Sequence, residues 1–118
     1  MITAVTGASG FVGGRLAQML TAQPGCEVRA LIRRGKPPQF ADGARAVIVR
    51  GDLADASILA QLLAPGCTVA NLAYDAQASA QANLTAAGAL AEACLKYGVR
   101  RLVHCSTAVV AGRARAID

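Results

Sequence analysis

Short apolar runs alternate along this chain with longer segments in which apolar residues recur every three or four positions. Four short runs rich in Val, Ile, Leu and Ala predict buried strands, at residues 2–5, 26–32, 46–49 and 67–72. Three periodic segments predict helices, at residues 11–23, 56–63 and 76–97. Strands that alternate with helices are typical of an α/β fold built on a parallel sheet.

The boundaries of these elements carry the expected residue types. Pro24-Gly25 and Pro65-Gly66 follow the first two helices, and Gly98 follows the third. Asp55 precedes the second helix and is predicted to be its N-cap and not a functional acid. Residues 35–43, which include two consecutive prolines, predict a loop.

A glycine-spaced turn joins the first strand to the first helix. Gly7 can turn the chain without a Cβ clash, Gly10 lets the backbone approach a pyrophosphate, and Gly13 lets the helix pack closely on the sheet. The N–H groups and positive dipole end of the helix would hold the anion. Such a turn can also be purely structural, but the flanking strand and helix favour dinucleotide binding. The candidate pyrophosphate-binding residues are Gly7, Ala8, Ser9, Gly10, Phe11, Val12 and Gly13.

The turn sequence Thr-Gly-x-x-Gly-x-x-Gly resembles the short-chain dehydrogenase/reductase superfamily, and the run from Thr6 to Gly13 resembles its extended type, the NAD-dependent epimerase/dehydratase family. The run that begins at Val99 is similar to the fifth strand of that family. The resemblance implies a Rossmann fold, a doubly wound parallel sheet of five strands in the order 3-2-1-4-5 with right-handed crossovers. It also implies hydride transfer between NAD or NADP and a small-molecule substrate.

The end of the second strand bears on the choice between NAD and NADP. An acidic residue there would bind the ribose 2′-hydroxyl of NAD, whereas an arginine accommodates a 2′-phosphate. The chain places Arg33 and Arg34 there, with no acid before Asp42 in the sequence. We therefore favour NADP over NAD, because a guanidinium can grip a phosphate with two hydrogen bonds. The alternative is that both arginines are solvated loop charges, with Arg33 stacked on adenine.

Two further strand ends match the family pattern. Gly51-Asp52-Leu53 is similar to the segment that lies against adenine in relatives, where a carboxylate can accept from the exocyclic amine; Asp52 could instead simply end the strand. Leu72-Ala73 corresponds to a short loop that passes the cofactor ribose on the nicotinamide side. Tyr74 departs from the alanine often found next, and is a candidate neighbour of the substrate.

Polar residues in the last third of the chain give the remaining candidates. By the same resemblance, Thr107 would hydrogen-bond the substrate oxygen, with Ser106 beside it near the nicotinamide; the alternative is two small residues that end a strand. His104, the only histidine, is predicted to be packed within the strand. Asn83, in the third helix, either orients water or backbone near the site or satisfies a buried carbonyl.

The acid/base pair of the superfamily is not in this sequence. In a Tyr-x-x-x-Lys pair, the lysine and the charge of the cofactor lower the tyrosine pKa. Neither Tyr74 nor Tyr97 is followed by a lysine at the required spacing, and the chain ends at Asp118. We expect residues 1–118 to be the NAD(P)-binding domain of a longer protein, without the catalytic helix and the substrate-binding part, and inactive alone.

Two functions stay open at this point. The first is the cofactor-binding half of a nucleotide-sugar epimerase/dehydratase or a related carbonyl/alcohol oxidoreductase, which Ser106 and Thr107 favour. The second is a non-catalytic relative that binds NAD(P) as a sensor or protein-interaction module. Ala111, at a position where an aromatic residue is usual, favours this second function.

Composition narrows the partners and the location. The net charge of +5 comes from dispersed basic residues without interleaved aromatics, so we expect a dinucleotide and not nucleic acid to be the anionic partner. No apolar stretch approaches the ~20 residues of a membrane span, and the N-terminus lacks a signal-peptide pattern, which indicates a soluble cytoplasmic protein.

The cysteines and the last strand complete the expectations. The cysteines are widely spaced in apolar surroundings, which indicates buried reduced thiols and no metal site: Cys26, Cys67, Cys94 and Cys105. A sheet that ends at its fifth strand exposes an edge, and self-association into a homo-oligomer through that edge is a further hypothesis.

Overall fold

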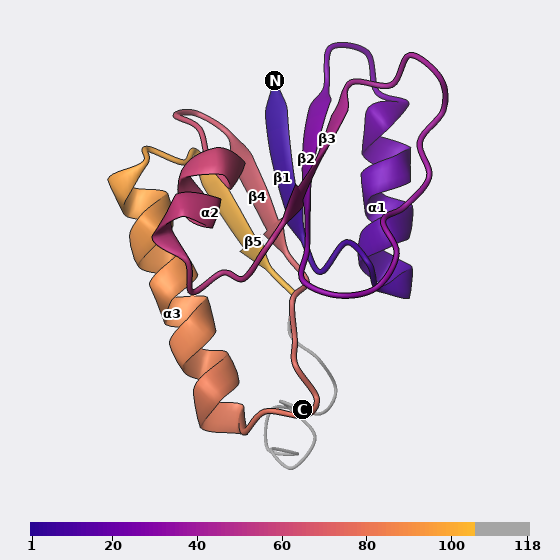
Figure 1. Cartoon of the computed structure of the whole chain (residues 1–118). Helices are drawn as coiled ribbons and strands as arrows, with labels where there is room; N and C mark the ends of the chain where they lie inside the picture. The colour runs from indigo at the N-terminus through magenta and orange to yellow at the C-terminus, as the bar shows by residue number, and fades with distance from the viewer. Residues whose placement is uncertain (106–118) are drawn as a thin grey trace, which may run out of the picture.

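Five parallel strands form one sheet in the order β3-β2-β1-β4-β5 in the computed structural model, which describes residues 1–105 (Figure 1). This is the predicted Rossmann topology. The strands are β1 Ile2–Thr6, β2 Glu27–Ile32, β3 Ala46–Arg50, β4 Thr68–Asn71 and β5 Arg101–His104. The helices between them are α1 Phe11–Thr21, α2 Ala56–Leu62 and α3 Ala80–Lys96.

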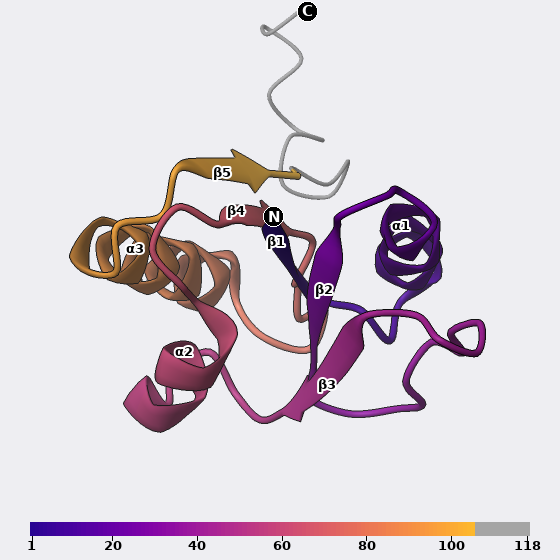
Figure 2. The same ribbon diagram turned by 90° about the horizontal axis from the view of Figure 1, so that it is seen from above.

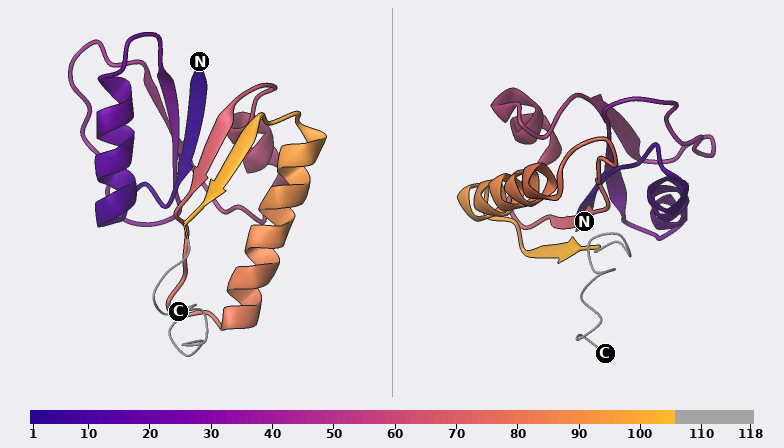
Figure 3. Two further views of the ribbon diagram at one scale, coloured as in Figure 1. Left: turned by 180° about the vertical axis from the view of Figure 1, so that it is seen from behind. Right: turned by 90° about the horizontal axis from the view of Figure 1, so that it is seen from below.

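The helices cover both faces of the sheet. Seen from above, α1 lies on one side, and α2 and α3 lie on the other (Figure 2). The same arrangement is seen from behind and from below (Figure 3). Because successive side chains of a strand point to opposite faces, adjacent Ala4 and Val5 of β1 belong to two different core clusters. This explains why the strands are continuous apolar runs instead of alternating ones.

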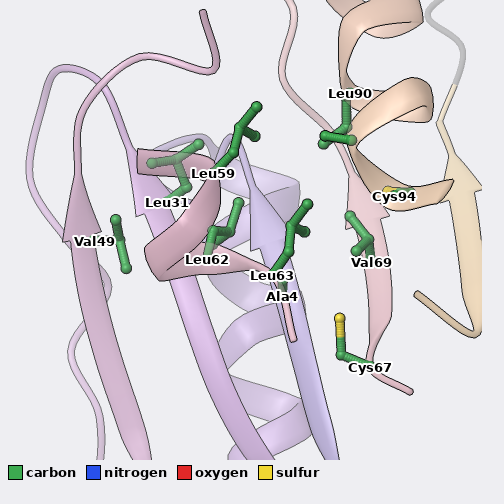
Figure 4. Packing of buried hydrophobic residues seen from close by; sticks show 11 residues of the cluster. Ala4, Leu31, Val49, Leu59, Leu62, Leu63, Cys67, Val69, Leu90 and Cys94 are labelled. Atoms are coloured by element: carbon green, nitrogen blue, oxygen red, sulfur yellow. The ribbon is translucent and has the colours of Figure 1, made fainter. Parts of the chain in front are cut away.

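The larger core cluster lies between the sheet and the α2/α3 layer (Figure 4). Leu62 of α2 is fully buried, and Leu90 of α3 is 1% exposed. Burying one such side chain contributes about 1.5–3 kcal/mol. The cluster fixes the two helices against one face of the sheet, with Leu31, Val49 and Val69 as their partners in the strands.

Helix α3 begins four residues later than the predicted Ala76. The side chain of Ser79 caps the helix, since its Oγ accepts a hydrogen bond from the Ala82 N–H at 3.0 Å. Ahead of it, Asp75 Oδ1 accepts from the Gln77 N–H at 2.9 Å, which holds the segment in a turn. Short polar side chains that bond to nearby backbone compete with helix formation. A prediction based on alanine content alone therefore placed the N-terminus of α3 too early.

Other boundaries agree with the sequence more closely. Asp55 is the N-cap of α2 as predicted, because its Oδ1 accepts from the Ser57 N–H at 2.9 Å and from the Ser57 hydroxyl at 2.8 Å. These bonds lower the pKa of Asp55, with the hydroxyl as the larger cause. Gly98 follows α3 with φ +71°, a conformation that glycine adopts without a Cβ clash.

Two predictions near the end of β5 are wrong. Cys26, Cys67 and Cys94 are buried thiols as expected, but Cys105 is exposed. His104 is also exposed and not packed within the sheet. Both follow from the position of β5, which pairs only with β4 among the described strands and leaves one side of the strand open. Among residues 1–105, no helix is long and apolar enough to cross a membrane.

Candidate functional site

A cleft with a volume of about 330 Å³ lies at the carboxyl ends of the strands. Parallel strands bring their carboxyl ends to one edge of the sheet, which is where open α/β sheets bind ligands. In Figure 1 this is the lower edge of the sheet, where β1 turns into α1. The lining residues come from five parts of the chain: Gly7 and Ser9; Leu31, Arg33 and Arg34; Gly51, Asp52 and Leu53; Asn71, Ala73, Tyr74 and Asp75; and Asn83, Ala86 and Ala87.

The glycine turn is packed too closely for side chains at two positions. Gly7 has φ +68°, and a Cβ there would lie 2.7 Å from the carbonyl oxygen of Leu72. A Cβ on Gly13 would collide with the carbonyl oxygen of Gly7. Gly10 differs, because a Cβ there would meet only Gly7 O, at 3.3 Å, and otherwise open space. Gly7 and Gly13 therefore close the turn, while Gly10 leaves its outer side accessible.

The start of α1 is free of side chains that would compete for its N–H groups. Gly10 is the N-cap and has no side chain to cap the helix, and the first turn contains no acidic residue. The glycine turn is fixed to β2, since the Ala8 N–H donates to Leu31 O at 3.1 Å. The unsatisfied N–H groups of a helix start, together with its dipole, attract anions.

Thr6 and Asn71 form a buried polar link beneath the cleft. Thr6 is fully buried, and its Oγ1 accepts from the backbone N–H of Leu72 at 3.1 Å and of Ala73 at 3.2 Å. The same hydroxyl donates to Asn71 Oδ1. Asn71 Nδ2 then donates to Nδ1 of His104 at 3.0 Å. The ends of β1, β4 and β5 are thus joined through side chains, and the loop after β4 is fixed against the glycine turn.

Arg33 is paired with acids from two other strand ends. Its Nη2 donates to Asp75 Oδ2 at 2.9 Å, and its Nη1 lies 3.9 Å from Asp52 Oδ2. The hydrogen bond that Arg33 donates to Asp75 is the main cause that raises the pKa of Arg33, and the same bond is the main cause that lowers the pKa of Asp75. In the sequence, no acid follows Arg33 before Asp42. The fold brings two acids to it, so it is not a purely solvated charge.

Asp52 contributes to both the cleft and the local turn. Its Oδ1 accepts from the Ala54 N–H at 2.9 Å, which shapes the chain after β3. Its other oxygen, Oδ2, faces Arg33, and the residue lines the cleft together with Leu53. The two readings of Asp52, as the end of a strand and as a cleft residue, are therefore compatible.

Asn83 orients backbone at the rim of the cleft. Its Oδ1 accepts from the Asp75 N–H, and its Nδ2 donates to the Asp75 carbonyl, both at 2.9 Å. Nδ2 also donates to Ser79 O at 3.0 Å. The first turn of α3 thereby holds the segment that carries Tyr74 and Asp75 into the cleft.

The structure brings about half of the predicted cofactor residues to the cleft wall. Those that line it are Gly7, Ser9, Arg33, Arg34, Asp52, Leu53 and Ala73. Five others belong to the turn or the start of α1 without lining the cleft: Ala8, Gly10, Phe11, Val12 and Gly13. Leu72, which follows β4, does not line it either. Ala8 is buried, whereas Phe11 is 83% exposed. Ser106 and Thr107 lie outside the described residues.

Several residues of the site were not predicted as such. Asn71 and Asp75 line the cleft, and Thr6 supports it from below. A sequence signal existed for Thr6 and Asn71, because each is a polar residue at the carboxyl end of a predicted apolar strand. No local pattern marks Asp75, since its partner Arg33 lies 42 residues away.

A profile of the NAD dependent epimerase/dehydratase family matches residues 3–118. The chain belongs to this family. The match covers almost the whole chain, from the second residue of β1 onward, and includes the glycine turn and all the strand ends described above. A comparison with curated protein sequences gives no significant match.

Solved structures similar to this family member have the same fold. The structure of gox2253 is 30% identical with a TM-score of 0.70 over 91% of this chain and 34% of that one. A short-chain dehydrogenase/reductase superfamily protein from Agrobacterium tumefaciens, solved with bound NAD, is 27% identical with a TM-score of 0.70 over 92% and 33%. A mutant uronate dehydrogenase from the same organism, complexed with NAD, is 25% identical with a TM-score of 0.67 over 90% and 40%. The chain therefore spans less than half the length of each of these proteins.

Proposed function

We propose that this chain binds a nicotinamide dinucleotide, with NADP preferred over NAD, and supplies the cofactor-binding part of an oxidoreductase or epimerase/dehydratase. The observation that carries the proposal is the glycine turn with an uncapped helix start at one end of a cleft that also holds two arginines. Family membership and the NAD complexes of two similar structures support the cofactor class.

The residues of the cleft fit such a ligand in their chemistry. The open side of Gly10 and the start of α1 would accept the pyrophosphate. Asp52 and Leu53 would lie against adenine, and Leu72 and Ala73 would pass the ribose on the nicotinamide side. Alanine at 73 allows a close approach, and the pair of N–H bonds to Thr6 keeps that loop in place.

The preference for NADP is proposed on charge. Arg33 and Arg34 both line the cleft beyond β2, the strand end where an arginine accommodates a 2′-phosphate. Arg34 has no acidic partner within 4 Å among the described residues, whereas Arg33 has two. Arg34 would therefore bind the 2′-phosphate directly. Arg33 would bind it only after the phosphate replaces the carboxylates of Asp52 and Asp75.

The chemistry of the whole protein is also a proposal. Bound nicotinamide would accept or donate a hydride at the substrate carbon. Ser106 and Thr107, which follow β5 in the sequence, would hydrogen-bond the substrate oxygen. Because the 118 residues contain no Tyr-x-x-x-Lys pair, we expect this chain to bind dinucleotide without turning over substrate.

Calorimetric titration of the chain with NADPH and with NADH tests the proposal. We expect saturable binding of both, with a lower dissociation constant for NADPH. A lower constant for NADH would contradict the NADP preference alone. Absence of heat with either dinucleotide, for a chain that unfolds cooperatively, would contradict the proposed function as a whole.

A further inference from the structure

Arg33 contacts acidic residues from two different loops that line the cleft. The residue follows β2, and its Nη2 donates to Asp75 Oδ2, which belongs to the loop between β4 and α3. Its Nη1 lies 3.9 Å from Asp52 Oδ2, after β3. All three residues line the same cleft. The guanidinium therefore already has two carboxylates nearby that a ligand phosphate would have to displace.

Asp75 is the fixed member of the pair. Its Oδ1 accepts from the Gln77 N–H at 2.9 Å, and its own N–H and carbonyl are both bonded to the side chain of Asn83. Arg33, by contrast, reaches Asp75 through a long flexible side chain that is 44% exposed. If a ligand draws Arg33 away, the carboxylate of Asp75 stays at the edge of the cleft.

The formal charges of the four ionisable residues around Arg33 sum to zero. Arg33 and Arg34 contribute two positive charges, and Asp52 and Asp75 contribute two negative ones. A phosphate monoester adds a charge of about −1.5 to −2 at neutral pH. It would compete with Asp75 for Arg33 and would be repelled by the carboxylate that remains. A ribose 2′-hydroxyl is neutral and does neither.

We propose that Asp75 is a specificity-determining residue, which weakens binding of a 2′-phosphorylated dinucleotide by competing for Arg33. The inference rests on the dinucleotide site proposed above. NAD leaves the Arg33–Asp75 pair intact, while NADP has to open it. The two arginines alone would give a wide preference for NADP, and Asp75 narrows it.

Asp75→Asn tests the proposal because it removes the charge and keeps an oxygen for the Gln77 N–H. In calorimetric titrations of the full 118-residue chain at low ionic strength, the variant should bind NADPH about two- to fivefold more tightly, the size expected of an exposed ion pair. The dissociation constant for NADH should change by less than about twofold. Asp75→Ser also removes the charge and serves if the asparagine variant does not fold.

Two further variants separate this role from a general charge effect. Glu27→Gln removes the same charge from a half-buried group, at the opposite end of β2, that lies 3.9 Å from Arg29 and from Arg45. It should alter neither dissociation constant. In an Arg33→Gln background, the gain from Asp75→Asn should shrink, because the competition no longer exists. Equal tightening of both dinucleotides, an unchanged constant for NADPH, or the same gain from Glu27→Gln would overturn the inference.

The outcomes also distinguish this inference from the proposed function. If the wild-type chain prefers NADH but Asp75→Asn shifts the ratio toward NADPH, the NADP preference is wrong and the role of Asp75 stands. If the wild type prefers NADPH but Asp75→Asn does not shift the ratio, the NADP preference stands and the proposed role of Asp75 is wrong. If neither dinucleotide binds to any variant, both are overturned.

Discussion

The side-chain amide of Asn71 donates a hydrogen bond to Nδ1 of His104 at 3.0 Å and accepts one from the hydroxyl of Thr6. This link ties the carboxyl ends of β4, β5 and β1 together below the cleft. Since an amide nitrogen can only donate, Nδ1 of His104 is the acceptor in this bond. Thr6 and Asn71 are nearly inaccessible to water, so water cannot replace a hydrogen bond that either side chain loses.

Thr6→Val should destabilise the fold, because it removes the hydroxyl without changing the shape of the side chain. The Leu72 N–H would lose its acceptor, and the Ala73 N–H would keep only its bond to Asn71 Oδ1 at 3.3 Å. Asn71 Oδ1 would also lose the Thr6 hydroxyl as a donor. Leaving buried polar groups unpaired costs about 1–3 kcal/mol, measurable as a decrease in the free energy of unfolding in urea. Thr3→Val is the matched control in the same strand, since among residues 1–105 its hydroxyl has a hydrogen-bond partner only in Cys26 Sγ, at 3.8 Å. A similar loss in both variants would contradict the specific role of Thr6.

Gly10→Ala should weaken dinucleotide binding while the chain stays folded. A methyl group at residue 10 meets only Gly7 O at 3.3 Å, but it occupies the open side on which the pyrophosphate would lie. We expect at least about a tenfold increase in the dissociation constant for NADPH, because the phosphates lose close approach to the N–H groups.

Gly88→Ala is the matched control for this glycine. Gly88 lies within α3, and a Cβ there would meet no atom within 4 Å. The change should leave binding unaltered and raise stability slightly, since alanine is the better helix former. Equal binding by the Gly10 and Gly88 variants would show that the turn does not hold the pyrophosphate.

The fold could be predicted from sequence because its signals are local. The apolar runs, the Pro-Gly and Gly boundaries and the glycine turn each lie within a few residues, and they predict the elements and their right-handed connections. The strand order itself was implied by the resemblance to the family. The start of α3 was placed too early for a related reason. Alanine has a strong helix propensity everywhere, whereas the stop imposed by Asp75 and Ser79 depends on the bonds their side chains make.

The candidate site could be predicted only as far as single strand ends. The sequence placed Arg33 and Asp52 at the edge of the sheet but could not show that they lie 3.9 Å apart. The Arg33–Asp75 pair spans 42 residues and depends on the path of two loops. His104 was misread because its exposure depends on β5 being at the edge of the described sheet, a property of the assembled strands and not of the residues around it.

The stability of the chain should depend on pH through Asp75. Its pKa in the folded chain lies below the ordinary value of 3.8, first because of the bond from Arg33 and then because of the Gln77 N–H. A depressed pKa contributes stability that is present above 3.8 and is lost as the pH falls through the lower, folded value. Unfolding free energies of the wild type and of Asp75→Asn should therefore differ near neutral pH and converge well below pH 3.8. Arg33→Gln should remove most of the same pH-dependent difference, and a gap that stays constant with pH would contradict this origin.

Self-association should occur through the edge of β5. This strand pairs only with β4 among the described strands, and its Val103 is 52% exposed. Exposed strand edges offer unpaired N–H and C=O groups to a second chain. We expect the sedimentation coefficient to rise with protein concentration, and Val103→Lys to suppress the rise by adding charge at the edge. A wild-type chain that stays monomeric at high concentration would contradict this prediction.

Leu90→Ala should loosen the α3 layer that carries Asn83 and, through it, Asp75. Leu90 is 1% exposed and belongs to the larger core cluster, so its removal leaves a cavity against the sheet. Leucine-to-alanine changes of this kind cost about 2–5 kcal/mol, which urea unfolding would report. Leu95→Ala on the same helix is the matched control, because Leu95 is 85% exposed and its truncation should change stability by less than about 0.5 kcal/mol. If the two variants were equally stable, the packing of Leu90 would not be what holds α3 on the sheet. The position of Asn83, and through it of Asp75, would then depend on other contacts.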